Sequence, residues 1–117
     1  SLPNLCAMES RTMNIEIVSV ATVQAWIAAG EAVIVDVRED NEFALEHIAE
    51  ATLVPLSRFD PAALPPSEGK RLVLHCRSGI RCGHAAGLLQ GSTLDTVYRM
   101  EGGILEWKQF GGPVVSH

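Results

Sequence analysis

Short apolar runs alternate along this 117-residue chain with segments of helical periodicity. The apolar runs are rich in Val and Ile, which is typical of strands. The runs predicted as strands are residues 14–20, 32–38, 51–56, 71–75 and 96–102. Helices are predicted over residues 21–30, 42–48, 83–91 and 103–111, and the connection 57–70 holds at most one helical turn. Because the strands are apolar on both faces and alternate with helices, the pattern predicts an α/β fold: one domain with a mostly parallel five-stranded sheet and helices on both faces.

The ends and the inward faces of the predicted helices follow from particular residues. Gly30 is expected to end the first helix, since glycine readily adopts a left-handed conformation at that position. Asp40 or Asn41 is expected to cap the second helix through a side-chain oxygen. The helical side chains expected in the core are Val23, Trp26, Ile27, Phe43, Leu45, Ile48, Ala85, Ala86, Leu88, Leu89, Ile104, Trp107 and Phe110.

Composition and charge narrow the class of protein. Residues 14–115 are predicted to form the domain, and residues 1–13 an N-terminal extension that is poorly ordered or not native. The 9 basic and 14 acidic residues give a net charge of −5, which argues against nucleic acid or an anionic membrane as partner. No apolar stretch reaches the roughly 18 residues that a membrane-spanning helix needs, and no signal-peptide pattern opens the sequence. We therefore expect a soluble, cytoplasmic protein.

The cysteines do not form a disulfide framework or a metal motif. There are three of them, Cys6, Cys76 and Cys82, an odd number that fits a reducing compartment. Cys76 and Cys82 are too far apart in sequence for a C-x-x-C zinc or redox pair. A metal site would also need His75 and His84 to converge with both thiols. We expect neither a metal nor another cofactor.

The segment HCRSGIRC, residues 75–82, holds the candidate chemistry. Cys76 directly follows a buried strand, and the next residues lead into a helix, so successive N–H groups can point at one centre and form an anion nest. The helix N-terminus adds partial positive charge. Such settings lower a cysteine pKa to roughly 3.5–7.5, which favours the nucleophilic thiolate. The sequence therefore predicts Cys76 as the nucleophile, with substrate-binding residues Arg77, Ser78, Gly79, Ile80 and Arg81.

Two anion chemistries fit a cysteine in such a loop. Cysteine phosphatases use a C-x5-R loop, in which the arginine clamps a tetrahedral phosphate. In this chain the sixth position after Cys76 is Cys82, and Arg81 comes one position earlier. The loop is one residue shorter than a phosphatase loop, so a phosphatase or arsenate reductase is the less favoured interpretation.

The sequence CRSGIR resembles the C-x-x-G-x-R loop of the rhodanese, or sulfurtransferase, family of single-domain type. Three further segments resemble that family in the same order: VIVDVRED at 33–40, HIAEATLVPL at 47–56 and EGGILEWKQFGGPV at 101–114. The resemblance implies a rhodanese-like domain. Glu50 and Leu53 depart from the glycine and asparagine of the family pattern, which affects the wall of the pocket and not the nucleophile.

The resemblance also implies a two-step reaction. Cys76 would attack a small anionic sulfur donor such as thiosulfate, hold the outer sulfur as a persulfide, and pass it to cyanide or a thiol. Arg77 and Arg81 would attract the donor, and an ionised thiol needs no separate base. A dedicated carrier that delivers sulfur only to an acceptor protein, with little activity on cyanide, remains an alternative. Both interpretations require that Cys76 be ionised near neutral pH and reachable from solvent.

Three residues near the loop are possible supporting groups. The resemblance suggests that Asp36 and Arg38 belong to a mainly structural network of ion pairs and hydrogen bonds. Cys82 could resolve the Cys76 persulfide into a disulfide, or pack as a small residue in the first helical turn, which we favour. His75 is expected to point away from the site by strand alternation.

Overall fold

The computed structural model describes residues 13–92 and 94–116. Its sheet has five strands in the order β1-β5-β4-β2-β3, and every pair of neighbouring strands is parallel. The strands are β1 (Asn14–Val18), β2 (Ala32–Asp36), β3 (Ala51–Leu53), β4 (Arg71–His75) and β5 (Thr96–Met100). The predicted α/β fold with a five-stranded parallel sheet is confirmed, although β3 is shorter than expected because Pro55 begins a 3-10 turn, η1 (Leu56–Arg58).

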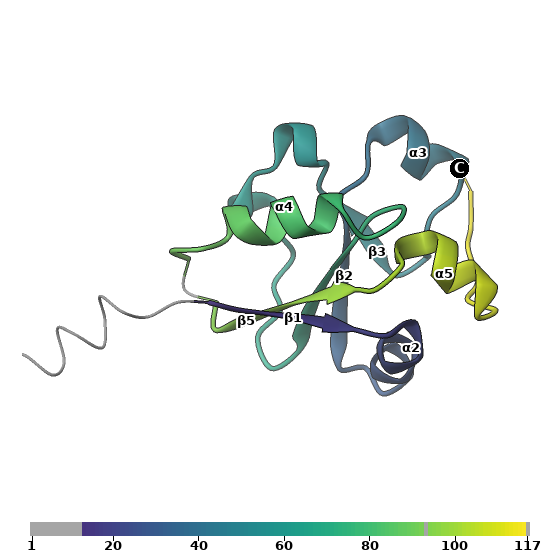
Figure 1. Ribbon diagram of the computed structural model, residues 1–117, viewed down its shortest axis with the longest axis horizontal. Coiled ribbons are helices and arrows are strands. Elements are labelled where there is room, and N and C mark those ends of the chain that lie inside the picture. The colour runs from purple at the N-terminus through teal and green to yellow at the C-terminus, as the bar shows by residue number, and fades with distance from the viewer. Residues whose placement is uncertain (1–12, 93, 117) are drawn as a thin grey trace, which may run out of the picture.

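Helices cover both faces of the sheet, as predicted (Figure 1). One face packs against α4 (Arg81–Leu88), and the other against α2 (Val20–Ala28) and α5 (Gly103–Gln109). The remaining elements lie in the connections: α3 (Asp40–Leu45) before β3, and a second 3-10 turn, η2 (Pro61–Ala63), before β4.

Alternation along β4 decides what lies on each face. Leu72 and Leu74 belong to the core under α4, whereas Val73 belongs to the core under α2 and α5. Cys76, the next residue after the strand, continues on the α4 side. His75 is fully buried, and its Nε2 lies 3.6 Å from Asp36 Oδ2 in the strand beside it. Its Nδ1 lies 3.2 Å from the backbone carbonyl oxygen of Cys76. Its ring therefore points away from the Cys76 side chain, as predicted.

Several helix predictions need correction. Glu39, and neither Asp40 nor Asn41, is the N-cap of α3, because Glu39 and Glu42 form a reciprocal capping box. This short helix ends at Leu45, which is 76% exposed, and Ile48 is buried only after the chain has left the helix. Two more side chains expected in the core are exposed, because each lies at the end of its helix: Leu88, the last residue of α4, is 57% exposed, and Phe110, which follows α5, is 56% exposed.

The edges of the domain differ from the prediction too. Met13, assigned to the extension, is buried in the α4-side core, and its N–H donates to Gln90 Oε1 at 3.2 Å. Ile15 and Ile17 of the edge strand β1 are exposed, so this strand is not covered on both faces. The rest of the predicted extension, Cys6 included, lies outside the described residues.

Candidate active site

The Cys76 sulfur lies in a nest of backbone amides at the carboxyl end of β4. Its Sγ accepts a hydrogen bond from the Gly79 N–H at 3.1 Å. The pKa of Cys76 is lowered from 9.0 to about 5, first by a hydrogen bond from the Cys82 thiol and then by the amides of Cys82, Gly79 and Ser78, against the opposing effect of burial. The predicted thiolate is thus supported by an explicit set of donors.

Helix α4 begins at Arg81, two residues earlier than expected, which places Cys82 in its first turn. Its N-cap, Ile80, offers no side-chain acceptor, so the first amides of the helix remain available to the sulfur. The Cys82 Sγ also lies 3.2 Å from the Gly79 carbonyl oxygen, to which it donates. The single thiol proton of Cys82 therefore has two acceptors, the Gly79 carbonyl and the Cys76 thiolate.

The Cys76 side chain is covered in this conformation. The residue is 1% exposed, which contradicts the expectation that solvent reaches the sulfur directly. The neighbouring loop residues Arg77, Ser78 and Ile80 are exposed, so the buried sulfur belongs to a loop that is itself at the protein surface.

The start of α5 fixes the loop from the other side. Ile104 N–H donates to the Cys76 carbonyl at 2.9 Å, and Leu105 N–H donates to the Arg77 carbonyl at 3.2 Å. With these carbonyls occupied, the loop amides face the sulfur. Gly103 allows this approach: its φ is +60°, and a Cβ there would lie 2.4 Å from the Cys76 and Arg77 carbonyl oxygens.

Arg81 and Arg77 have different surroundings. Arg81 binds both carboxylate oxygens of Glu42, at 2.6 and 2.9 Å, and this hydrogen-bonded ion pair lowers the pKa of Glu42 to about 2. The charge of Arg81 is therefore largely compensated. Arg77 is exposed and has no carboxylate partner among the residues that the structure describes. Arg77 is thus an exposed cation in the loop that holds the sulfur.

Arg99 of β5 reaches the same loop, a role that the sequence analysis missed. Its Nη2 donates to the Gly79 carbonyl at 2.8 Å. A Cβ on Gly83 of α4 would lie 2.9 Å from that same Nη2, so the absence of a side chain at Gly83 makes room for the guanidinium. The available signal was a charged residue inside an otherwise buried strand.

Asp36 and Arg38 form a buried network on the other face of the sheet. Arg38 Nε and Nη2 donate to the Asp36 carboxylate at 2.8–3.1 Å, and Nη2 also donates to the Glu46 carbonyl at 2.7 Å. His75 Nε2 lies 3.6 Å from Asp36 Oδ2, and burial lowers the pKa of His75, which keeps the ring neutral. This network supports the strand ends behind the site and makes no recorded contact with the sulfur.

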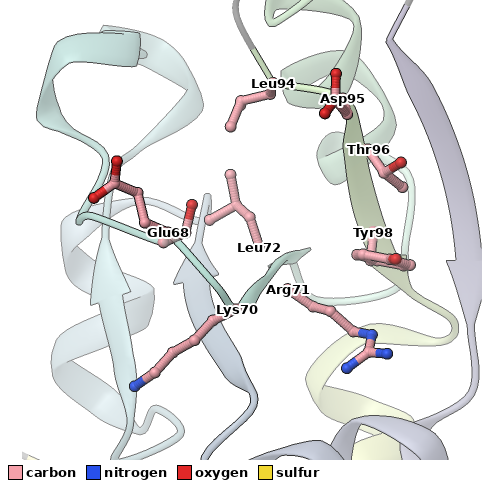
Figure 2. A pocket seen from close by; sticks show the side chains of 9 residues that line it. Glu68, Lys70, Arg71, Leu72, Leu94, Asp95, Thr96 and Tyr98 are labelled. Carbon is pink, nitrogen blue, oxygen red and sulfur yellow. The ribbon is translucent and has the colours of Figure 1, made fainter.

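Two hollows help to locate the site. The larger, of about 450 Å³, lies at the amino ends of β4 and β5, at the opposite edge of the sheet from Cys76 (Figure 2). Its side chains have mixed charge, with the acidic Glu68 and Asp95 and the basic Lys70 and Arg71, and none is a nucleophilic cysteine. A smaller hollow of about 190 Å³ lies beside Arg77, against α3 and α5, and provides space next to the nest.

The described part of the chain contains no cluster of three or more His, Cys, Asp or Glu side chains arranged to hold a metal ion. Within residues 13–92 and 94–116, no helix combines the length and hydropathy that crossing a bilayer requires.

Comparison with known proteins decides the family. The sequence profile of the rhodanese-like domain matches residues 19–110. The chain belongs to the rhodanese-like family. The matched range includes the predicted CRSGIR loop, so the resemblance inferred from that motif is confirmed, and the protein is placed in a family of sulfurtransferase type.

Individual relatives are consistent with this rhodanese-like assignment. The uncharacterized protein slr1261 of Synechocystis is 41% identical over 109 residues, covering 93% of this chain and 61% of that protein. The tRNA uridine(34) hydroxylase of Erwinia tasmaniensis is 34% identical over 93 residues, which is 74% of this chain but 27% of that protein. The crystal structure of a rhodanese-related protein from Thermoplasma volcanium superimposes with a TM-score of 0.73 and 30% identity, covering 87% of this chain and 99% of that one. The chain thus spans less than two thirds of the length of these curated relatives.

Proposed function

We propose that this rhodanese-like domain is a sulfurtransferase that carries a sulfane sulfur as a persulfide on Cys76. The sulfur comes from a small anionic donor such as thiosulfate and goes to cyanide or a thiol. The observation that carries the proposal is the set of donors around the sulfur, the Cys82 thiol first and then the amides of Cys82, Gly79 and Ser78, which lowers the pKa of Cys76 to about 5. At neutral pH the sulfur is therefore a thiolate, which is the form that attacks a sulfur donor.

The reaction takes place in two displacements. The Cys76 thiolate attacks the outer sulfur of thiosulfate, so that an S–S bond to Cys76 forms as the bond to the sulfonate breaks and sulfite leaves. Cyanide then attacks the outer sulfur of the persulfide, thiocyanate leaves, and the electron pair of the breaking bond restores the thiolate. The nest amides stabilise the anionic sulfur before and after each step. No general base is needed, because the thiol is already ionised.

Access to Cys76 requires the loop to open. The covered sulfur reacts with a donor only while residues 77–80 are displaced, and the exposed cation of Arg77 attracts the anion to that position. The persulfide then closes into the nest, where solvent and unrelated thiols are excluded. Such protection favours an acceptor that itself promotes opening, so delivery to an acceptor protein is a second candidate function.

The pairing of Arg81 with Glu42 favours sulfur transfer over phosphate chemistry. A phosphatase needs its loop arginine free to bind phosphate in two places, whereas Arg81 is already bound at two points by Glu42. The shorter loop agrees with this preference. We also propose a reducing cytoplasm as the location, where Cys76 and Cys82 stay as the free thiols that the structure contains.

The proposal is tested by incubating the protein with thiosulfate and cyanide and measuring thiocyanate. We expect turnover by the native chain and none by Cys76→Ser. Cys6→Ser is the matched control for losing a thiol elsewhere and should keep full activity. Thiocyanate formation that survives in Cys76→Ser would overturn the assignment of the nucleophile, and transfer only to a protein thiol would favour the carrier.

A further inference from the structure

Arg99 lies beneath the active-site loop as an incompletely paired cation. It pairs in register with Leu74 of β4, and its side chain extends on the α4 side to Gly79. Its Nε is buried and has no hydrogen-bond partner within the described residues, and no carboxylate there pairs with its guanidinium. The residue as a whole is half-buried, and a buried N–H without a partner is costly unless the rest of the group serves its neighbours.

Gly79 connects Arg99 to the reactive sulfur. The carbonyl of Gly79 accepts from Arg99 Nη2 at 2.8 Å and from the Cys82 thiol at 3.2 Å, while the N–H of Gly79 donates to Cys76 Sγ at 3.1 Å. The φ of Gly79 is +108°, a conformation that other residues rarely adopt. The φ and ψ of Gly79 set the direction of its N–H relative to its carbonyl, so a carbonyl held by Arg99 restrains the directions open to the N–H.

We infer that Arg99 is a positioning residue that holds Gly79 in the conformation in which its N–H faces the Cys76 sulfur. The use of this arrangement in catalysis rests on the proposed sulfurtransferase function. The effect of Arg99 on the ionisation of Cys76 does not, because it exists without any sulfur donor. The Cys82 thiol supports the same carbonyl, but its proton is shared with Cys76. The guanidinium of Arg99 also interacts with the Cys82 sulfur, but its Nη2 donates to the Gly79 carbonyl at 2.8 Å, so it keeps Gly79 oriented when the Cys82 proton turns to the thiolate.

The experiment is the pH profile of Cys76 alkylation by iodoacetamide, followed by mass spectrometry of tryptic peptides. Trypsin cuts after Arg71, Arg77 and Arg81, so Cys76 and Cys82 are read on separate peptides. In Arg99→Met we expect the midpoint to move to higher pH and the alkylation rate below the midpoint to fall about tenfold, as a rise of one pKa unit requires. The plateau rate at high pH should rise, because a loosened loop opens more often.

Two further variants separate positioning from a general loss of structure. Arg99→Lys keeps a cationic donor and should recover part of the native midpoint. Gly83→Ala leaves Arg99 in place but displaces its Nη2, so it should shift the midpoint in the same direction by less, and add nothing in the Arg99→Met background. Circular dichroism and thermal melts show whether each variant folds.

The outcomes are distinct. If Arg99→Met and Gly83→Ala both fold and their Cys76 alkylation has the same midpoint pH as in the native chain, the positioning role of Arg99 is overturned. An equal shift in Arg99→Lys and Arg99→Met would contradict the need for a cationic donor. Absence of thiocyanate formation by the native chain, together with the expected alkylation shifts, would reject the proposed function and leave the role of Arg99 intact.

Discussion

Glu42 and Arg81 lie 39 residues apart in sequence and form a two-point ion pair, with N–O distances of 2.6 and 2.9 Å. The same carboxylate accepts from the Glu39 N–H at 3.0 Å and so closes the capping box of α3. One side chain therefore joins α3 to the end of the active-site loop. It also leaves Arg77 as the cation available to an incoming anion.

Replacing Glu42 with Gln should destabilise the domain by about 1 kcal/mol, since it removes a partly screened, charge-assisted pair. The pKa of Glu42 falls on folding from 4.5 to about 2, so its ionised form stabilises the native state. That contribution is complete above about pH 4.5 and is lost as the pH falls through about 2. Urea unfolding at neutral pH and at low pH should therefore show a difference between the native chain and Glu42→Gln that shrinks in acid.

The matched control is Glu31→Gln. Glu31 pairs with Arg71 at 3.4 Å on the surface, where both side chains are largely exposed, and should contribute almost nothing. Equal losses of stability in the two variants, or a Glu42 contribution that persists at the acid end, would show that the ion pair at the loop has no special role.

Gly103→Ala should disrupt the site more than any substitution of an exposed loop side chain. The new Cβ would lie 2.4 Å from the carbonyl oxygens of Cys76 and Arg77, at a residue that already has positive φ. We expect a loss of at least about 2 kcal/mol in unfolding free energy and a strong fall in Cys76 reactivity. Gly87→Ala is the comparison: a Cβ there meets nothing within 4 Å, and alanine in helix α4 should be neutral or stabilising by up to about 1 kcal/mol. Similar melting curves for the two variants would contradict the close-approach argument.

Cys82 is predicted to assist the thiolate as a proton donor. The pKa of Cys82 is raised first because its thiol proton is hydrogen-bonded to the Cys76 sulfur, then because the site is buried, and then because its thiolate would face the Cys76 thiolate. We therefore expect Cys82→Ala to raise the pKa of Cys76, and Cys82→Ser, which keeps a donor, to raise it less. Ultraviolet absorbance of the thiolate against pH measures both. A Cys76–Cys82 disulfide after polysulfide treatment, detected by mass spectrometry, would restore the resolving role instead.

Arg77 should control capture of an anionic donor. In Arg77→Ala the KM for thiosulfate should rise roughly tenfold, because the exposed cation beside the nest is lost. Alkylation of Cys76 by neutral iodoacetamide should change little, since no charge is being attracted. If both reactions slow equally, Arg77 acts on loop opening and not on donor binding.

The amide nest around Cys76 could be predicted from the sequence because its geometry is local. Cys76 follows a buried strand, and Gly79 and the helix start come within the next few residues, so the amide nest needs no distant partner. Strand alternation likewise placed His75 on the opposite face.

The rest of the site depends on contacts that no local pattern contains. Glu42 and Arg99 meet the loop only through the packing of α3 and β5, and Gly103 only through the approach of α5. The exposure of Leu45 follows from the early end of a six-residue helix, which periodicity alone does not show. The burial of Cys76 is also a tertiary effect, because residues distant in sequence, at the start of α5, pack against its loop.

The most direct test of the account is the mass of the tryptic peptide 72–77 after the protein is incubated with thiosulfate and freed from it. We predict that this peptide, which contains Cys76, gains the mass of one sulfur atom, and that cyanide removes it with release of an equal amount of thiocyanate. A peptide of unchanged mass, or a sulfur atom found on Cys82 while Cys76 stays unmodified, would contradict the central claim.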